Sequence, residues 1–441
     1  MPDPLRVAVL GSGPAGIYAS QALAQANAEV DVFDRLPAPY GLVRYGVAPD
    51  HLKIKSVART LQQVFELPGV RFIGNVTYGS DVTLAELRQS YDAVLFATGA
   101  PHDRRLGVPG EDLAGSVAAA DVVNWYCGLP GSNTEIGLHA TDVAIVGAGN
   151  VALDVARILA KGAPALQHTD MPDQVLAGLG VSAATDIHVL ARRGPAQAKF
   201  TLVELREMGE LPDADVVVDP TELQLDEASK EAMAGRRTVR TMVELFNTWA
   251  ERKPTGKPRR VHFHFLSLPT ALLGSDRVES LQIERGRLDG TGGVVGTGER
   301  QTVPAQLVVR SIGYRGAPIE GLPFDERSGT VPNEAGRVGE PGCYVAGWIK
   351  RGPTGVIGTN RSDATETVAT LLGDAAALPR APQRDPDAIL ALLESRGVGY
   401  VTWDGWLRLD GHEIELGRAQ GRERTKVAEL AAMLKISRRP S

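Results

Sequence analysis

A pattern of apolar strand, glycine turn and helix occurs twice in the chain, and it constrains the fold more than any other feature. In the first copy, Leu5–Leu10 leads through Gly11-Ser-Gly-Pro-Ala-Gly16 into an Ala-rich stretch. In the second, residues 142–146 lead through Gly147-Ala-Gly-Asn-Val-Ala152 into a similar stretch. Apolar strands that alternate with helices are typical of parallel sheets covered on both faces. The expected fold class is α/β, with two dinucleotide-binding Rossmann-like domains.

The length and charge of the chain agree with this expectation. A chain of 441 residues with 43% hydrophobic content exceeds what one core usually serves, so two domains are expected. The formal net charge of −6 argues against a dominant nucleic-acid surface. The N-terminus has no signal-peptide pattern, and no stretch has about 18 consecutive apolar residues. We therefore expect no membrane span and a cytoplasmic location.

The cysteine content excludes several classes of redox enzyme. The chain has two cysteines, Cys127 and Cys343, and no Cys-x-x-Cys pair. A dithiol reductase of the thioredoxin-reductase kind needs two neighbouring thiols, and an iron–sulfur cluster needs about four thiolates. We expect both cysteines to be buried, reduced thiols, and we expect no metal site.

The first glycine turn has the pattern of a site for adenosine diphosphate. Such a turn lets the backbone approach a pyrophosphate, while the N-terminus of the next helix directs N–H groups at the anion. The following strand ends in Asp34, about twenty residues on, where a carboxylate accepts both ribose hydroxyls. Thr98 and Gly99 end a further strand with small residues, as a nearby flavin nucleotide requires. These residues predict a site for FAD or NAD.

The second glycine turn differs at the position that selects the nucleotide. Its following strand ends in Arg192 and Arg193, where the first copy has an acid. Guanidinium groups bind a 2′-phosphate that a carboxylate would repel, so this site is predicted to prefer NADPH to NADH. Two sites of different preference imply transfer between two cofactors. Because neighbouring thiols are lacking, output of single electrons from a flavin is favoured.

Four longer strings resemble one known family. They are residues 39–51 (PYGLVRYGVAPDH), 149–157 (GNVALDVAR), 191–195 (ARRGP) and 347–360 (GWIKRGPTGVIGTN). They occur in the order found in adrenodoxin reductase and its bacterial relatives, which are NADPH–ferredoxin reductases, and the resemblance covers about Leu5 to Leu372. It implies an FAD domain of residues 1–103 and 312–441, with a C-terminal extension from about 378, and an inserted NADP domain of residues 104–311.

The resemblance also implies site residues. Those that fall where the family contacts FAD are Gly11, Gly13, Pro14, Ala15, Gly16, Asp34, Arg35, Gly41, Leu42, a strand around Val76 and Tyr78, Thr98, Gly99, Trp348, Gly355, Val356 and Ile357. Those that fall where it contacts NADP are Gly147, Ala148, Gly149, Asn150, Val151, Arg192, Arg193, Glu204 and Gly355. Trp348 and residues 355–357 correspond to the isoalloxazine contacts. His51 corresponds to a histidine near the redox centre. We expect both His51 and Glu204 to modulate the reaction.

The partner implied by the resemblance is an acidic ferredoxin-type iron–sulfur protein. An acidic reductase needs a local basic patch to steer it, and Arg236, Arg237 and Arg240 on a charged helical stretch are the main candidates. Arg206, Lys350 and Arg351 are further candidates. The region after residue 378 is expected to be helical at both ends, with Trp403 and Trp406 on a short β-like segment between them.

Two other functions remain open at the level of sequence. A flavin monooxygenase also combines FAD and NADPH sites, and it would consume oxygen with an organic substrate. A non-catalytic, NADPH-sensing flavoprotein subunit of a larger complex would lack diaphorase activity.

Overall fold

The computed structural model describes residues 4–133 and 135–438, and the chain in it divides into two compact units. The first comprises residues up to His102, the short segment Cys127–Gly131 and residues from Tyr314 on, and the second comprises Asp103–Tyr126 and Ser132–Gly313. The domain boundaries expected from the sequence were 103/104 and 311/312. Residues 1–3 and 439–441, which begin and end the expected FAD domain, lie outside the described residues. The strands β5 (His102–Asp103) and β15 (Tyr314–Arg315) stand where the chain passes between the units.

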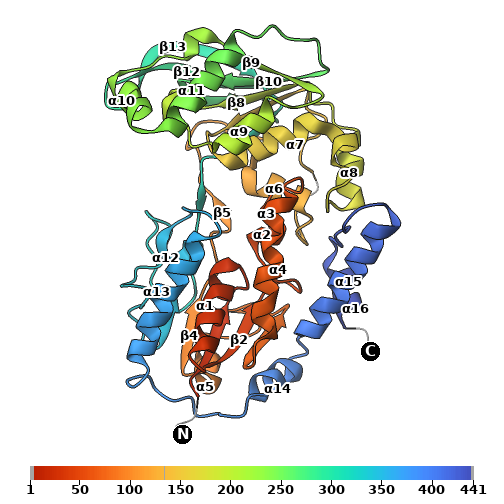
Figure 1. The fold of residues 1–441 in the computed structure, drawn as a ribbon, viewed down its shortest axis with the longest axis vertical. Helices are drawn as coiled ribbons and strands as arrows, with labels where there is room; N and C mark the ends of the chain where they lie inside the picture. The colour runs from red at the N-terminus through yellow and green to blue at the C-terminus, as the bar shows by residue number, and fades with distance from the viewer. Residues whose placement is uncertain (1–3, 134, 439–441) are drawn as a thin grey trace. The chain divides into compact units, whose positions relative to one another are not determined.

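The first unit is built on a five-stranded parallel sheet in the order β16-β4-β1-β2-β3. Its strands are β1 (Arg6–Leu10), β2 (Glu29–Asp34), β3 (Val70–Gly74), β4 (Ala93–Phe96) and β16 (Cys343–Val345). The late strand β16 pairs with the early strand β4, so both chain ends contribute to one sheet. Helices α1 (Pro14–Gln25) and α13 (Thr359–Asp374) pack side by side on it (Figure 1).

The other helices of the first unit are short near the N-terminus and longer near the C-terminus. They are α2 (Leu42–Tyr45), α3 (Leu52–Lys55), α4 (Val57–Gln62), α5 (Leu84–Ser90), α12 (Trp348–Arg351), α14 (Ala388–Ser395), α15 (Trp403–Ala419) and α16 (Leu430–Ser437). The expected β-like segment at Trp403 and Trp406 was wrong, because both residues lie in the first turn of α15. Thr402 caps this helix by accepting a hydrogen bond from Gly405 N–H.

The second unit contains a six-stranded parallel sheet in the order β6-β14-β7-β8-β10-β9. Its strands are β6 (Ser116–Ala118), β7 (Asp142–Val146), β8 (Asp186–Leu190), β9 (Ala214–Val218), β10 (Arg259–His264) and β14 (Leu307–Arg310). A three-stranded antiparallel sheet follows β10 in the chain and consists of β11 (Ser267–Leu273), β12 (Ser280–Leu288) and β13 (Val294–Pro304). Its Leu281 and Ile283 share a buried cluster with Ala144 and Leu190 of the parallel sheet.

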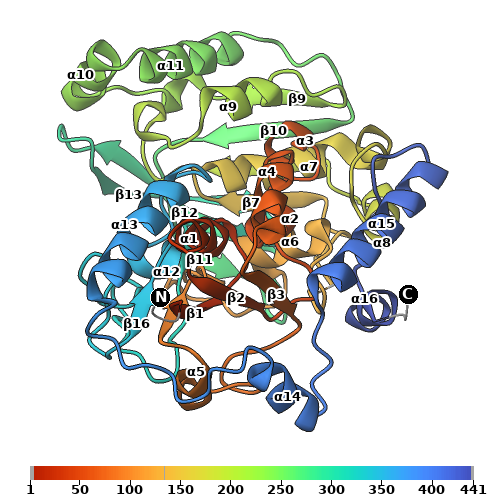
Figure 2. The ribbon, with the colours of Figure 1, turned by 60° about the horizontal axis from the view of Figure 1, so that its bottom comes forward.

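The helices of the second unit include the one that follows the second glycine turn. They are α6 (Ala119–Cys127), whose last residue is counted with the first unit, α7 (Asn150–Leu166), α8 (Asp173–Gly180), α9 (Leu202–Met208), α10 (Glu227–Gly235) and α11 (Arg237–Ala250). Figure 2 shows α10 and α11 next to each other. Phe246 and Trp249 on α11 pack against Phe263 of β10, so this helix is anchored on the sheet by aromatic contacts.

Among the described residues, no helix combines the length and apolarity needed to cross a membrane. Cys127 and Cys343 are both buried, as predicted from the sequence.

Three histidines lie side by side on the parallel sheet of the second unit. His188 on β8 pairs in register with His262 on β10, and their rings stack with centroids 4.6 Å apart. Nδ1 of His188 lies 3.0 Å from Nε2 of His264. The charged groups around them form two ion pairs: Asp186, beside His262, binds Arg260, and Glu222, 3.7 Å from His264, binds Arg285. Burial lowers the pKa of His188 to about 3, and the neighbouring His262 and His264 add to this effect.

We expect these histidines to make the protein less stable in acid. Because the pKa of His188 lies below 6.5 in the folded state, the unfolded chain binds the proton more readily. The stability contributed by the neutral ring is therefore complete above pH 6.5, and it is lost as the pH falls toward 3, by at most about 1.4 kcal/mol per pH unit. In His188→Gln, the loss in the free energy of unfolding between pH 7.5 and pH 5 should be about 2 kcal/mol smaller than in the wild type.

Urea denaturation at the two pH values measures this difference. The matched control is His168→Gln, which removes an exposed histidine from the same unit. If the free energy of unfolding fell by the same amount between pH 7.5 and pH 5 in His188→Gln and in the wild type, His188 would not be the cause of the lower stability in acid.

Candidate dinucleotide-binding sites

The first glycine turn joins β1 to α1 and is too closely packed at Gly11 for a side chain. Gly11 has a φ of +111°, and a Cβ at this position would lie 2.5 Å from the carbonyl oxygen of Ala97. Gly13 is the N-cap of α1, and Pro14 takes the first helical position. The first N–H groups of a helix have no partners within it, and here the bare turn leaves them accessible to an anion. The turn therefore fits the pyrophosphate of a dinucleotide.

Asp34 is held beside this turn at the end of β2. Its Oδ2 accepts hydrogen bonds from the N–H of Ser12 at 2.9 Å and from the Ser12 hydroxyl at 2.5 Å, and its Oδ1 accepts one from Leu36 N–H. Burial raises the pKa of the Asp34 carboxyl, while the hydrogen bonds from Ser12 and Leu36 act in the opposite direction. The carboxyl is thus fixed next to the position expected for the ribose. Ser12 was not predicted as a site residue, although the hydroxyl between two glycines was a signal for it.

Two further segments of the first unit lie close to the turn. A Cβ at Gly41 would lie 2.9 Å from Cα of Gly13, so the predicted site residue Gly41, which Leu42 follows, lies against the glycine turn. Leu42 is 42% exposed, which leaves an apolar side chain available to a ligand. Thr98 and Gly99 follow β4, and a Cβ at Gly99 would meet nothing within 4 Å. Arg35 is exposed, and Ala15 is buried in the first turn of α1.

The expected strand around Val76 and Tyr78 was wrong. The strand β3 ends at Gly74, because Asn75 adopts a positive φ of 59° and turns the chain. Val76 is buried, and its N–H donates to the carbonyl of Asp34, so it still lies beside the end of β2. The Tyr78 hydroxyl donates to the carbonyl of Glu320 at 2.6 Å.

The residues expected near the isoalloxazine surround two short turns. Trp348 begins α12, and its ring stacks on Tyr314 with centroids 5.7 Å apart. Gly355, Val356 and Ile357 precede α13, which begins only at Thr359, and Val356 is 73% exposed. An exposed valine in a glycine-rich turn leaves apolar surface free for a flat ring.

Lys350 does not suit a docking surface. Its side chain is 7% exposed, and its Nζ lies 3.1 Å from Asp363 and 2.6 Å from Glu366. The candidate steering role for Lys350 was therefore wrong, because a buried, paired ammonium group contributes little field at the surface. The neighbouring Arg351 is also turned inward, toward the carbonyl of Thr354 and the side chain of Asn360.

The second glycine turn joins β7 to α7 in the same way as the first joins β1 to α1. A Cβ at Gly147 would lie 2.1 Å from the carbonyl oxygen of Ser311, whereas a Cβ at Gly149, the N-cap of α7, would meet nothing within 4 Å. Asn150 and Val151 are the first residues of α7. The turn is supported by the segment before α9, because Lys199 N–H donates to Ala148 and Thr201 N–H donates to Oδ1 of Asn150. The second turn therefore also fits a pyrophosphate.

Arg192 and Arg193 follow β8, next to this turn. Gly147 N–H donates to the carbonyl of Leu190, which ties the end of β8 to the turn. Arg192 is exposed and Arg193 is partly exposed, and neither guanidinium has an ion pair with any residue that the structure describes. Two such cations just beyond the carboxyl end of β8 fit a phosphate group.

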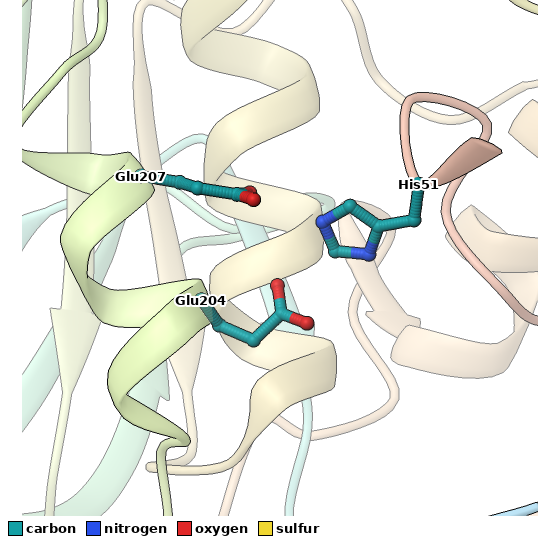
Figure 3. Close-up of side chains that lie close together, drawn as sticks. All are labelled: His51, Glu204 and Glu207. Carbon is teal, nitrogen blue, oxygen red and sulfur yellow. The ribbon is translucent and has the colours of Figure 1, made fainter. Parts of the chain in front are cut away.

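Glu204 lies on α9 in a buried ionic cluster. Its carboxylate is 3.2 Å from Nη1 of Arg157, a side chain with no exposed surface, and Asp154 and Glu207 contact the same guanidinium. Figure 3 shows Glu204 and Glu207 one turn apart on α9, with both carboxylates on the same side of the helix. The pattern Thr201-x-x-Glu204 was a signal for the start of this helix, since the Thr201 hydroxyl accepts from Glu204 N–H.

His51, also drawn in Figure 3, is the N-cap residue of α3 in the first unit. Its N–H donates to the carbonyl of Ala48, and its own carbonyl accepts from Ile54 and Lys55. The side chain is partly exposed.

Comparisons with known proteins agree with this picture of two sites. Residues 5–197 match the family model described as pyridine nucleotide-disulphide oxidoreductase. The chain is 44% identical to NADPH-ferredoxin reductase FprA of Mycobacterium tuberculosis, over 98% of this chain and 99% of that protein. It is 40% identical to the human mitochondrial NADPH:adrenodoxin oxidoreductase, over 98% of this chain and 91% of that protein.

A solved structure of M. tuberculosis FprA in complex with NADPH is also similar. It superimposes with a TM-score of 0.93 at 43% sequence identity, and the match covers 99% of this chain and all of the other. The likeness thus extends over both glycine turns and over the C-terminal helices.

Proposed function

The chain belongs to the adrenodoxin reductase-type family of NADPH–ferredoxin reductases, and from this premise we propose how its residues divide the work of the reaction. It is an FAD-dependent oxidoreductase that transfers electrons from NADPH to a ferredoxin-type iron–sulfur protein. The observation that carries this assignment in the molecule itself is the contrast between Asp34 at the first turn and Arg192 and Arg193 at the second, which form no ion pair with a described residue.

The first unit provides the residues for FAD. We assign the pyrophosphate to the turn Gly11–Gly16 and the ribose to Asp34, which Ser12 holds in place. The chemistry that FAD would supply at this site is acceptance of a hydride from NADPH and release of the two electrons one at a time. Trp348 would offer a flat apolar wall, and the N–H groups of Gly355 and Ile357 could stabilise negative charge on the flavin ring, whereas Val356 N–H already donates to the Thr359 hydroxyl.

The second unit provides the residues for NADPH. We assign the pyrophosphate to residues 147–151 and the 2′-phosphate to Arg192 and Arg193. Hydride transfer between two rings needs no general base, so the residues of the chain act by binding and orientation. Glu204, fixed by Arg157, is assigned to orient NADPH, and His51 to modulate the redox centre.

Steady-state kinetics test the assignment as a whole. Reduction of cytochrome c is measured with NADPH and with NADH, in the presence and absence of added ferredoxin. We expect a strong preference for NADPH and a rate that depends on ferredoxin. NADPH oxidation that is coupled to oxygen and an organic substrate would instead indicate a monooxygenase, and an FAD-loaded protein without diaphorase activity would indicate a sensing subunit.

We further propose that an acidic ferredoxin docks near the N-terminus of α11. Arg236, Arg237 and Arg240 are all exposed there, and among the residues that the structure describes only Arg240 of the three has an ion pair, with Glu244 at 3.9 Å. Exposed cations that are not neutralised by neighbours attract an acidic partner and raise its association rate. A cytoplasmic location is proposed as well, in line with the expectation from the sequence.

Reversal of Arg236, Arg237 and Arg240 to glutamate should raise the KM for ferredoxin about ten-fold at low salt, because steering is lost. Ferricyanide reduction by NADPH should not change, since it needs no docking. The matched control reverses three exposed cations elsewhere in the same unit, Arg252, Lys253 and Arg300, which gives the same change in net charge. Equal ferredoxin kinetics in the two triple variants would remove the patch from the docking surface.

A further inference from the structure

The segment Tyr40–Tyr45 lies directly against the first glycine turn. Tyr40 N–H donates to the carbonyl of Ser12 at 2.9 Å, and Gly41 lies so near Gly13 that a Cβ on Gly41 would be 2.9 Å from Cα of Gly13. To make this approach, Tyr40 adopts a φ of +83° and Gly41 a φ of +49°. A positive φ is unfavourable for a tyrosine, so this turn needs support from other parts of the protein.

That support comes from the opposite end of the chain. Trp406 in the first turn of α15 is 1% exposed, and its ring packs edge-on against Tyr40 with centroids 5.8 Å apart. The guanidinium of Arg44 lies over the same indole, 5.1 Å from its centroid. One tryptophan thus contacts both ends of the turn.

A buried ion pair joins the same two segments. Arg44 donates to both carboxylate oxygens of Glu413 on α15, at 2.9 and 2.6 Å, and the two side chains are 5% and 0% exposed. Lys426, also buried, donates to the backbone carbonyls of Arg44 and Cys127. Glu413 additionally accepts from Val427 N–H. Removal of one partner from such a pair leaves an uncompensated buried charge, so the contact tolerates little change.

We propose that the C-terminal segment Trp403–Val427 is a clamp that holds the turn Tyr40–Tyr45 against the glycine turn in the geometry that FAD needs. This inference rests on the proposed assignment of the first glycine turn to FAD. Glu413 and Trp406 are then positioning residues, which act on FAD through Arg44 and Tyr40. The clamp gives a role to a region of the chain that the nucleotide motifs leave without one.

The test compares Glu413→Gln with Glu415→Gln, an exposed acid two residues further on the same helix. FAD is removed from each full-length protein, and the Kd for FAD is measured by titration of flavin fluorescence. We expect the Kd of Glu413→Gln to rise about ten-fold or more and that of Glu415→Gln to stay within about two-fold of the wild type. The Kd for NADP⁺ should be the same in all three proteins, because the clamp lies in the other unit.

Other outcomes distinguish a failure of the proposed clamp from a failure of the assignment of the first glycine turn to FAD. A Glu413→Gln protein with a lower Tm but an unchanged Kd for FAD would overturn the clamp, since the pair would then serve stability alone. A wild-type apoprotein that did not bind FAD would overturn the proposed function itself. If Glu413→Gln did not fold, Trp406→Phe would decide, because it removes the indole from Tyr40 and Arg44 but keeps an aromatic ring. Weaker FAD binding in that variant supports the clamp, and unchanged binding overturns it.

Discussion

Replacement of Arg192 and Arg193 together by alanine should weaken NADPH binding by about 100-fold and leave NADH binding within a few-fold of the wild type. The physical reason is the 2′-phosphate, which only NADPH carries. A charge-assisted hydrogen bond contributes about 1.5–3 kcal/mol, and because Arg192 is exposed we take the lower value for each side chain, about 3 kcal/mol for the pair. The loss is expected to be this large because no carboxylate among the described residues competes for either guanidinium.

Calorimetric titration with NADP⁺ and NAD⁺ measures the effect without any contribution from the flavin reaction. Arg277→Ala with Arg300→Ala is the matched control, since both arginines are exposed in the same unit and lie on the antiparallel sheet or its β11–β12 connection. Equal losses for the two nucleotides in the Arg192/Arg193 variant would show that these residues do not recognise the phosphate. The salt dependence of NADP⁺ binding should also decrease, because two phosphate contacts have been removed.

The parts of the fold that repeat a strong local pattern were predictable from the sequence. The strands β1, β2, β7 and β8 are buried apolar runs, and the glycine turns that follow β1 and β7 have a spacing that few other structures require. The family resemblance implied only that the two ends of the chain share one domain, and the pairing of β16 with β4 was not predicted, because a strand of three residues has no periodicity of its own.

The errors have local causes. Trp403 and Trp406 were expected on a β-like segment because aromatic residues favour strands, but the Thr402 cap and tertiary contacts of Trp406 place them in a helix. The strand expected at Val76 and Tyr78 is replaced by a turn at Asn75, a residue that tolerates positive φ.

The candidate sites were less predictable than the fold, since they depend on contacts between distant residues. From the sequence alone, Lys350 was expected to be an exposed cation. Its ion pairs with Asp363 and Glu366 are visible only in the structure. Glu413 gave no signal at all, because a single acid in a polar helix is normally exposed, and its partner Arg44 lies 369 residues away. Long-range ion pairs of this kind leave no trace in composition or periodicity.

A second large effect is expected at Gly16, where α1 crosses β1. A Cβ at this position would lie 1.9 Å from the carbonyl oxygen of Gly11 and 3.3 Å from Cγ1 of Val9. Neither the carbonyl nor the helix backbone can move without opening the glycine turn, so Gly16→Ala must shift α1 away from the sheet. We expect a cost of about 3 kcal/mol or more in the free energy of unfolding, which corresponds to a fall in Tm of roughly 6–12 °C.

The same shift moves the N–H groups at the start of α1 away from the pyrophosphate, so purified Gly16→Ala should contain less than about a tenth of the wild-type FAD. Flavin absorbance and thermal unfolding measure the two effects. Gly373→Ala is the control. Gly373 lies in α13 of the same unit, and a Cβ at this position would meet nothing within 4 Å. Alanine there should be neutral or stabilise the helix by up to about 1 kcal/mol. A Gly16→Ala protein that contained FAD and had the Tm of the wild type would contradict this prediction. It would mean that α1 can shift without disturbing the glycine turn, and that the close contact of α1 with β1 does not determine the geometry of the FAD site.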